Sequence, residues 1–338
     1  MTAEAIFHRA GPGLTIQDLG RPGHISRGLS QGGAADRLAL FEAAALLALS
    51  EPVAGVEMAG LGGEVSVTEP TRIALTGAPM RAAVDGRPLP WHASHMLEPS
   101  QRLSIGGAEA GAYGYLTFAG GIATNPWLGS RSAHLAAGIG ERIRTDDRLP
   151  IGPDPAPGGR SRIIDAELRF SGGKIRVMPG PQTMLFTPEV WRRFLDTAFQ
   201  RATDANRQGV RLSHDGACLA AEMSGGIASD FIGPGDIQMT GEGVPFVLLS
   251  ESQTTGGYPR IATVIAADLP RVAQAPAGSI LRFTELTVEA ADALWRSEAA
   301  TLSELRRKVR PLTRDPREIS DLLAYQLISG ATSGDDLG

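Results

Sequence analysis

Glycine and proline are the residues that most constrain this sequence, because together they occur about once in every five positions. The 338 residues include 42 glycines and 23 prolines, whereas aromatic residues make up only 5%. Both residue types disfavour helix interiors and mark turns. Long uninterrupted helices are therefore excluded as the main architecture, and a mainly β fold with many short strands and a few helices is expected.

Charge and cysteine content exclude several functional classes. The formal net charge is −5, so no overall positive field attracts nucleic acid or anionic membranes. Cys218 is the single cysteine, which excludes an intramolecular disulfide framework and fits a reducing compartment. No run approaches the roughly 20 apolar residues needed to cross a bilayer, and the N-terminus does not resemble a signal peptide. We therefore expect a cytoplasmic protein with no nucleic-acid or membrane partner.

The expected strands are short β-branched or alternating runs bounded by Gly, Pro and Asp. Asp85-Gly86 lies between two such runs and predicts a type I′ hairpin, in which both turn residues have positive φ. Consecutive strands there should be antiparallel. The clearest runs cover residues 64–68, 72–76, 81–84, 115–119, 174–178, 246–249 and 261–266.

Helical periodicity interrupts the strand pattern in four places. Residues 36–49 predict a helix capped by Asp36, and a second helix should begin at Thr187-Pro188 and carry Phe194 and Phe199 on one face. A longer helix is expected over residues 287–309; its apolar stripe fits core packing better than a partner surface. A short helix is expected over residues 319–328.

The segment from residue 150 to 159 predicts the seam between two domains. It contains four prolines and three glycines, which prevent regular strand pairing. We expect an N-terminal subdomain over residues 1–160, a C-terminal subdomain over 161–330 and a frayed tail over 331–338.

Several familiar catalytic motifs are absent or unconvincing. The sequence contains no P-loop, no dinucleotide-binding glycine pattern and no two-histidine zinc motif. His92 and His95 are close in sequence, but surface or turn positions explain them better than metal binding, and no metal site is expected. Ser30 lies in a G-x-S-x-G pattern. The expected helix starts too late for a nucleophile elbow, and no partner histidine is evident, so a flexible loop is favoured over a hydrolase nucleophile.

The segment from residue 250 to 260 is the richest in functional groups. Glycines that adopt positive φ let backbone N–H groups converge on an anion, so this segment predicts a pocket for a small carboxylate. An ordinary wide hairpin loop is an equally good interpretation of its composition. Its candidate residues are Gln253, Thr254, Thr255, Gly256, Gly257, Tyr258 and Arg260.

Three further positions carry weaker signals. Asp268 follows the next expected strand and could accept a proton, although a helix N-cap is the favoured interpretation. Near the N-terminus, Gln17 and Arg21 belong to a polar turn in which Asp18 can pair with Arg21. Gln182 ends a rigid strand exit and has the structural role usual for a single amide.

Taken in order, these segments resemble one family of proteins. The resemblance is to biotin-dependent carboxyltransferases and the C-type subunit of 5-oxoprolinase, also called allophanate hydrolase subunit 2 or urea amidolyase-related protein. It is carried by GLTIQDLGRPG (13–23), GGAADRLAL (32–40), IALTGA (73–78), YLTFAGGI (115–122), LGSRS (128–132), VMPGPQ (177–182), QTTGGYPRIATVIAADLPRVAQ (253–274) and LLAYQLISG (322–330).

The resemblance implies two cyclophilin-like β-barrel subdomains, similar to part of the carboxyltransferase region of urea carboxylase. It also implies a partner like the B-type subunit of 5-oxoprolinase, homologous to the other half of that region, and a possible third component. The sequence shows no biotinyl-lysine motif, ATP signature or amidase serine cluster. ATP is therefore expected to be bound with partner subunits, and any biotin to be carried on a separate protein.

The activity that the resemblance implies is ATP-dependent hydrolysis of a lactam or amide to a free acid, as in a 5-oxoprolinase complex. One alternative is biotin-dependent carboxyl transfer to urea or a related amide, and another is a non-catalytic regulatory role. The loop over residues 28–36 departs from the family pattern: it lacks the usual Pro, and Gly32 replaces a Ser. Ala44 stands where relatives carry Asn. These departures bear on the substrate and leave the expected fold unchanged.

Candidate roles follow for the individual residues. Gln253, Arg260 and Asp268 are the candidate catalytic residues, and Asp268 would orient the amide nitrogen or relay a proton. Backbone N–H groups of the 253–258 loop would hold a substrate carboxylate. Arg21, Arg131 or Arg260 would neutralise a phosphoryl or carboxyl intermediate. Gln17 and Gln182 are further candidates for substrate binding. We expect the 253–258 loop and Asp268 to converge on one solvent-accessible cavity that can hold a small acid.

Overall fold

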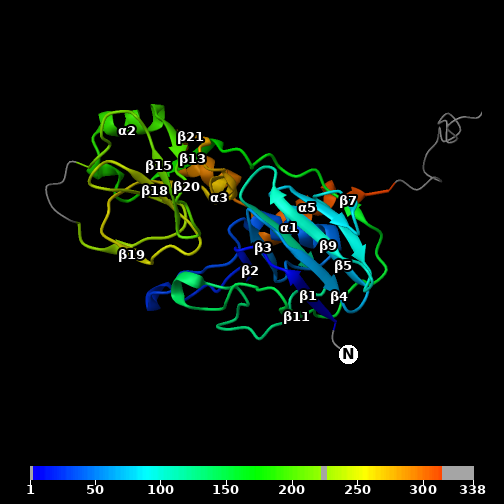
Figure 1. Ribbon diagram of the computed structural model, residues 1–338. Coiled ribbons are helices and arrows are strands. Elements are labelled where there is room, and N and C mark those ends of the chain that lie inside the picture. Colours follow the sequence, from blue (N-terminus) through cyan, green and yellow to red (C-terminus); the bar gives the residue numbers. More distant parts are fainter. Residues whose placement is uncertain (1–2, 222–226, 314–338) are drawn as a thin grey trace, which may run out of the picture.

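The computed structural model describes residues 3–221 and 227–313 and confirms the mainly β class (Figure 1). An N-terminal half built from two sheets lies beside a C-terminal barrel. The helix expected over residues 319–328 and the tail over 331–338 lie outside the described residues. Of the described part, no helix is long and apolar enough to cross a membrane.

The N-terminal half consists of a six-stranded and a seven-stranded sheet with an apolar core that includes Phe7, Val56, Leu103 and Phe118. The six-stranded sheet has the order β11 (Arg148–Pro150), β1 (Glu4–Arg9), β4 (Glu64–Val67), β9 (Leu103–Ala108), β6 (Met80–Val84), β7 (Arg87–Leu89). The seven-stranded sheet has the order β2 (Leu14–Gln17), β3 (Gly55–Ala59), β10 (Tyr113–Phe118), β5 (Thr71–Gly77), β8 (Ala93–Leu97), β12 (Arg162–Ile163), β22 (Arg310–Pro311).

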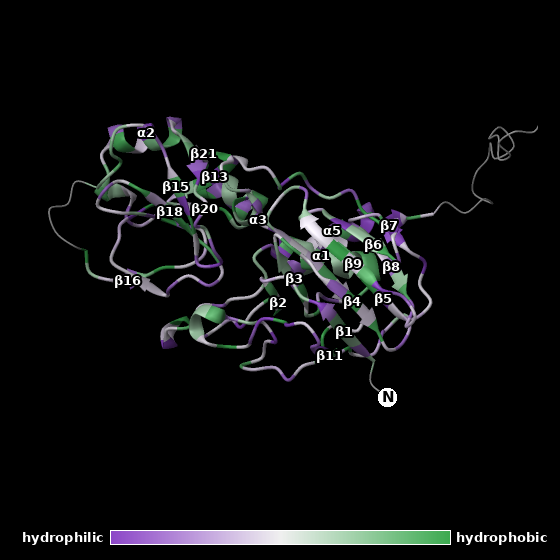
Figure 2. Ribbon diagram, in the orientation of Figure 1, coloured by the Kyte–Doolittle hydropathy of each residue, from purple (hydrophilic) through white to green (hydrophobic). Residues whose placement is uncertain are grey.

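Burial alternates along the strands that face solvent on one side, because successive side chains point to opposite faces of a sheet. Strand β6 buries Met80, Ala82 and Val84 and exposes Arg81. In Figure 2 such strands carry apolar residues beside hydrophilic ones. Strand β5 is buried along its whole length because α1 covers it.

The predicted hairpin between β6 and β7 is confirmed. The two strands pair antiparallel, with Val84 opposite Arg87. Asp85 has φ of 49° and Gly86 has φ of 80°, as a type I′ turn requires.

The first helix, α1 (Arg37–Leu47), lies where the sequence predicted it. The Asp36 carboxylate accepts a hydrogen bond from the Ala39 N–H and so caps the helix. Nearly all of α1 is buried, since it packs between β5 and α5 (Glu298–Lys308).

The C-terminal half is a closed barrel whose core includes three neighbouring phenylalanines. Phe194 and Phe283 stack with their ring centroids 4.7 Å apart, and Phe199 packs against both. The barrel has the order β13 (Gly173–Pro179), β20 (Arg260–Val264), β17 (Asp236–Met239), β18 (Pro245–Leu248), β15 (Gly209–Ser213), β14 (Ala198–Arg201), β21 (Ile280–Glu285). A short ribbon of β16 (Asp230–Phe231) and β19 (Thr255–Gly256) extends from it.

Two helix predictions need correction. The helix α2 (Pro188–Asp196) begins at the predicted Thr187 cap but ends earlier, and Phe199 lies on strand β14. The single helix expected over residues 287–309 is two helices, α4 (Val288–Leu294) and α5. The chain becomes extended at Trp295, and Ser297 caps α5 through a bond from Ala300 N–H. Periodicity alone did not reveal this second N-cap.

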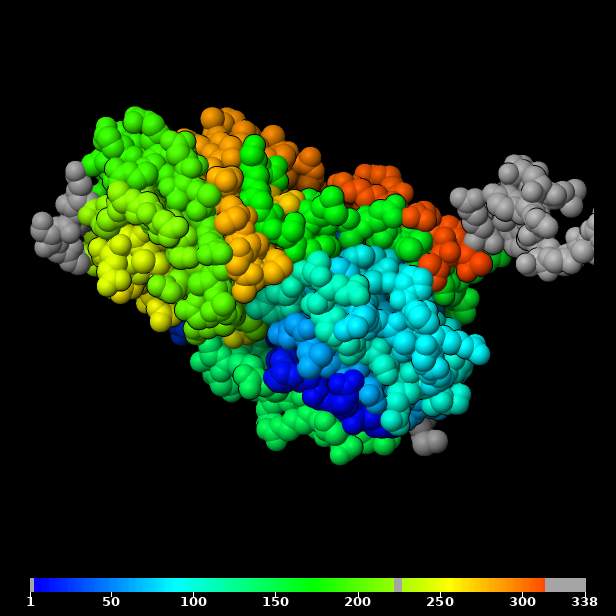
Figure 3. Space-filling model, turned by 45° about the horizontal axis from the view of Figure 1, so that its top comes forward, coloured from blue at the N-terminus to red at the C-terminus, as the bar shows by residue number. Residues whose placement is uncertain are grey.

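A buried ionic network joins the two halves beside α3 (Leu269–Gln274). Arg169 donates to Asp36 at 2.7 Å and to both oxygens of Glu42 at 2.8 Å. Gln274 donates to Asp36 and to the backbone carbonyl of Tyr113, both at 2.8 Å. Burial opposes the charge of Arg169, but the two carboxylates outweigh it and raise the pKa of this guanidinium above its usual range. Figure 3 shows the segment of α3 in yellow-orange where the barrel meets the N-terminal half.

The division of the chain near residue 160 remains a prediction. Strands β12 and β22 come from beyond that point, yet they extend the seven-stranded sheet of the N-terminal half. Helix α5 likewise returns to pack on α1. The C-terminal segment therefore contributes to both halves of the molecule.

Candidate functional site

The predicted site residues fall into two groups and one outlier. Gln17 ends strand β2 and lies with the loop residues Arg21 and Arg131 in the N-terminal half, whereas Gln182 and Arg260 lie with the 253–258 loop on the barrel. Residues 250–251 connect the groups, since Gly32 N–H donates to the Ser250 carbonyl at 3.0 Å. Asp268 is the outlier.

The loops meet at a polar group that we call the junction cluster: Arg21, Ser30, Glu57, His134, Arg207 and Glu251. Arg207 links its members, because its Nε donates to Glu251 at 2.6 Å and its Nη1 and Nη2 donate to Glu57 and the Gly33 carbonyl. Burial opposes the charge of Arg207, yet Glu57 and Glu251 outweigh it and raise the pKa of Arg207. The cluster therefore couples the N-terminal sheet to the barrel loops through paired charges.

Ser30 and His134 are in direct contact within the cluster. Ser30 Oγ and His134 Nε2 are 2.8 Å apart, and His134 Nδ1 lies 3.9 Å from Glu251 Oε2. Burial lowers the pKa of His134, with Arg21 and Arg207 acting in the same direction and Glu251 opposing them. The imidazole is therefore neutral at pH 7 and can accept a proton from a hydroxyl group or a water molecule.

Arg21 is almost completely buried beside this pair. Its Nη2 donates to the Ser132 carbonyl, and its guanidinium lies 5.9 Å from the Trp127 ring centroid. Its Nη1 has no hydrogen-bond partner among the described residues. The pairing of Arg21 with Asp18 that the sequence suggested is not found as a salt bridge. Asp18 accepts instead from Gly20 N–H at 2.8 Å and from Ser130 at 2.6 Å.

The other N-terminal candidates differ in exposure. Gln17 is buried; its amide donates to Thr15 and to the Ala133 carbonyl, and its Oε1 has no partner among the described residues. Arg131 is exposed, and its Nε donates to the Thr124 carbonyl at 2.7 Å. Gln17 therefore supports the loop at residue 133, whereas the Arg131 side chain faces solvent.

The 253–258 loop does not form the expected nest of backbone N–H groups. Thr255 and Gly256 pair with Asp230 and Phe231 as an antiparallel ribbon, and neither Gly256 nor Gly257 has positive φ. A Cβ at position 256 would meet the ends of two flexible side chains, at 2.5 Å from Gln238 Nε2 and 2.9 Å from Ile232 Cδ1. The side chains of the loop also diverge: Thr254 is buried, whereas Gln253, Thr255 and Tyr258 are exposed.

Arg260 is held by its own neighbours. Its backbone N–H and Nε both donate to Gln182 Oε1, at 3.0 and 3.2 Å. Its Nη groups contact Asp236 at 3.3 Å and Asp230. Gln182 and Arg260 therefore do come together, as expected, but two carboxylates already neutralise the guanidinium.

Asp268 does not converge with the loop, which corrects the expectation of one shared cavity. It follows β20, whereas the loop precedes β20, and the five residues of that strand separate its ends by about 13 Å. Its carboxylate accepts from the backbone N–H of Arg176 at 2.7 Å and from Nε of Arg176 at 2.9 Å. Asp268 precedes α3, as the N-cap interpretation predicted, but its side chain makes no capping bond.

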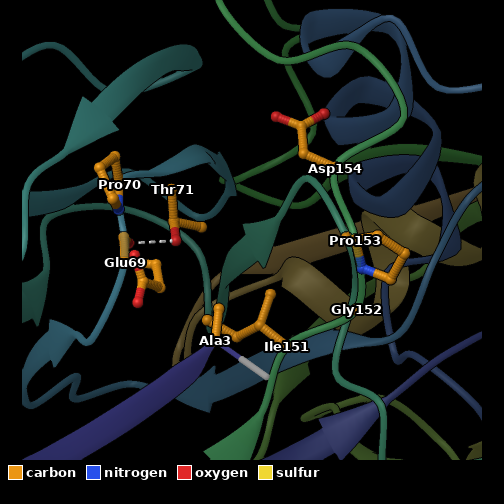
Figure 4. Close-up of a pocket in the computed structure, with 9 residues that line it drawn as sticks. Ala3, Glu69, Pro70, Thr71, Ile151, Gly152, Pro153 and Asp154 are labelled. Carbon is orange, nitrogen blue, oxygen red and sulfur yellow. Dashed lines mark hydrogen bonds between the residues drawn. The ribbon is translucent and has the colours of Figure 1, made fainter. Parts of the chain in front are cut away.

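One well-defined pocket of the described structure is lined by residues other than the predicted ones. A pocket of about 370 Å³ lies beside Glu69, Thr71 and Asp154, and Figure 4 shows the Asp154 carboxylate directed away from Ala3 and Ile151. That carboxylate is bound by Arg72. Within residues 3–221 and 227–313, no group of three or more His, Cys, Asp or Glu residues could hold a metal ion.

The paired histidines have packing roles. His95 is buried and hydrogen-bonds the Pro90 carbonyl at 2.8 Å, which corrects the expectation of a surface position. His92 lies in a turn, as expected, and stacks on Phe170.

Comparison with known proteins identifies the family. A sequence model of the family described as "Carboxyltransferase domain, subdomain A and B" matches residues 27–285. The chain belongs to this carboxyltransferase-domain family. Two curated relatives are named as the C-type subunit of 5-oxoprolinase: one from Escherichia coli (strain K12), 34% identical over 290 residues, and one from Haemophilus influenzae, 31% identical over 299 residues. The alignments cover 84% and 87% of this chain and 91% and 95% of the relatives.

Comparison with a solved structure confirms the fold. The urea carboxylase of Kluyveromyces lactis superimposes with a TM-score of 0.81 at 22% identity, over 93% of this chain and 31% of that one. At this identity the similarity shows the shared architecture.

Sequence reasoning missed most of the junction cluster. Ser30 was noticed through its motif but had no visible partner, although His134 follows the LGSRS segment by two residues. Glu57 and Arg207 lie in stretches without any motif. Only the packing of the barrel against the N-terminal loops brings them together.

Proposed function

We propose that this chain is the C-type subunit of an ATP-dependent 5-oxoprolinase complex, which opens a lactam to a free acid. It acts with a partner of the B type and a third component, and ATP is bound with those partners. The alignment with the C-type subunit of E. coli 5-oxoprolinase over 91% of that relative is the observation that supports this proposal most strongly.

The junction cluster is the proposed reaction centre. Opening a lactam requires attack on the carbonyl carbon, cleavage of the C–N bond and proton transfer to the ring nitrogen. His134 is a neutral, buried imidazole in contact with Ser30 and near Glu251. It is suited to accept a proton from the attacking nucleophile and to donate it to the ring nitrogen when the C–N bond breaks. Gln253 lies two residues beyond Glu251, so the exposed part of its loop can contact substrate or partner. We assign Asp268 no catalytic role, because its carboxylate is already hydrogen-bonded to Arg176.

Reconstitution tests the proposal. The chain is co-purified with a B-type partner and the third component, and ATP-dependent consumption of 5-oxoproline is measured. The proposal predicts consumption of 5-oxoproline that requires ATP and every component. A tight complex without turnover would refute it and favour the regulatory alternative.

A second candidate function is biotin-dependent carboxyl transfer to urea or a related amide, which the family description favours. In that case biotin is carried on a separate protein. Avidin distinguishes the two, since it should abolish carboxyl transfer and leave an ATP-dependent lactamase unaffected.

The proposed complex belongs in the cytoplasm. The single cysteine, which is exposed, is compatible with a reducing compartment. Fractionation of expressing cells would check this assignment, and recovery of the chain with the membrane fraction would contradict it.

A further inference from the structure

The unusual feature of the junction cluster is a buried cationic group with unused donors. The Arg21 side chain is 1% exposed, its Nη2 donates to the Ser132 carbonyl, and its Nε is 3.5 Å from the Trp127 carbonyl. Nη1 carries two further N–H groups and has no partner among the described residues. Buried polar groups are nearly always hydrogen-bonded, so an unpaired guanidinium nitrogen calls for an acceptor.

Other buried polar groups of the segments that meet at the junction cluster are also unpaired. A Cβ added to Gly32 would be 3.5 Å from Arg21 Nη1 and 3.2 Å from the His134 ring, so both groups lie close to the backbone of Gly32. His134 Nδ1 has no partner within the described residues, and neither do the hydroxyl groups of Ser250 and Ser252. These serines flank Glu251, whose Oε2 lies 3.9 Å from His134 Nδ1.

The acids near Arg21 are already committed elsewhere. Glu251 accepts from Arg207 at 2.6 Å, and Asp18 accepts from the hydroxyl groups of Ser130 and Ser132. The unpaired set thus combines a positive charge with hydroxyl donors and lacks an anion. Its missing partner is therefore a hydrogen-bond acceptor that carries negative charge.

We propose that Arg21 Nη1, His134 and the hydroxyl groups of Ser250 and Ser252 bind the carboxylate group of a small substrate. The proposal rests on the proposed function and assigns the substrate's acid group to this cluster, whereas the sequence placed it on the 253–258 loop. The paired strand conformation of Thr255 and Gly256 agrees with this change.

Calorimetric titration of the full-length chain tests the proposal with two lactams that differ only in the acid group. 5-Oxoproline carries a carboxylate, and 2-pyrrolidinone is the same ring without it. We expect 5-oxoproline to bind at least about tenfold more tightly, as a charge-assisted hydrogen bond predicts. Equal affinities, or no binding of either lactam, would overturn the proposal.

Variants locate the contact. Ser250→Ala combined with Ser252→Ala removes two hydroxyl groups that have no partner in the described structure, so folding should be unaffected. This double variant and Arg21→Gln should each weaken 5-oxoproline binding about tenfold or more and leave 2-pyrrolidinone unchanged. Arg148→Gln, which alters a surface pair with Glu4, is the control. Unchanged 5-oxoproline affinity in the serine double variant and in a folded Arg21→Gln chain would refute the assignment.

The outcome separates this inference from the proposed function. Carboxylate binding that depends on Arg21, without turnover in the reconstituted complex, would overturn only the 5-oxoprolinase assignment. ATP-dependent turnover that survives Arg21→Gln with an unchanged KM for 5-oxoproline would overturn only the carboxylate subsite.

Discussion

Replacing Arg169 by Met should strongly destabilise the protein, because it leaves two carboxylates buried without their countercharge. Asp36 and Glu42 are 0% and 1% exposed, and Arg169 makes three hydrogen bonds to them. Removing one partner of a buried ion pair costs about 3–5 kcal/mol. Asp36 keeps the hydrogen bond from Gln274, so most of the loss should come from Glu42.

Urea unfolding followed by tryptophan fluorescence measures this loss as a lower midpoint with an unchanged slope. The matched control is Arg9→Met, whose half-exposed pair with Glu64 should contribute less than about 1 kcal/mol. Arg169→Met combined with Glu42→Gln should recover part of the loss by removing one stranded charge. A single Arg169→Met variant within about 1 kcal/mol of wild type would refute the reasoning.

The same variant has a defined pH dependence. Burial raises the pKa of Glu42, with Arg169 opposing that effect, so protonation of Glu42 favours the folded state. The destabilisation in Arg169→Met should therefore be smallest at low pH, where Glu42 is protonated in both proteins, and grow as the pH rises above the raised pKa of Glu42 in the wild type. A loss that is equally large at pH 4 and pH 7 would contradict a charge-based cause.

Three further predictions concern other residues. Burial lowers the pKa of His92 to about 4. The neutral ring therefore stabilises the folded protein above pH 6.5, and this contribution is lost as the pH falls toward 4. In urea titrations at a series of pH values, His92→Asn should remove up to about 3 kcal/mol of this pH dependence relative to wild type. Ser30→Ala should leave the imidazole that it contacts unpaired, costing about 1–3 kcal/mol and moving the pH profile of turnover; an unchanged profile would exclude the pair from proton transfer. Gly120→Ala should greatly lower the melting temperature because its Cβ would overlap the Gly152 carbonyl, whereas Gly241→Ala, with open surroundings, should not.

The sequence predicted local features well where one or two residues decide the conformation. Asp36 and Thr187 cap helices at the expected positions, and Asp85-Gly86 turns the expected hairpin. A capping side chain, or a residue that tolerates positive φ, determines the conformation of only the next few residues. Its effect can therefore be predicted from the neighbouring sequence. The composition rich in glycine and proline likewise predicted short strands.

The contacts of the candidate site residues could not be predicted from the local sequence. The 253–258 loop contains the composition of an anion nest, but pairing with Asp230 and Phe231 holds it extended. The sequence gives no partner for Asp268, but in the structure its carboxylate accepts a hydrogen bond from Arg176, which lies 92 positions earlier. In both cases the deciding contact is distant along the chain.

By itself, the sequence determined the mainly β class, the starts of α1 and α2, the family and the expected activity, because these depend on local conformation and on ordered motifs. Only the tertiary structure decided which polar groups share an environment. Ser30, His134, Arg207 and Glu251 are spread over more than 200 positions and meet because the barrel packs against the N-terminal loops. Their burial together, with Arg21 left short of an acceptor, is a property of that packing.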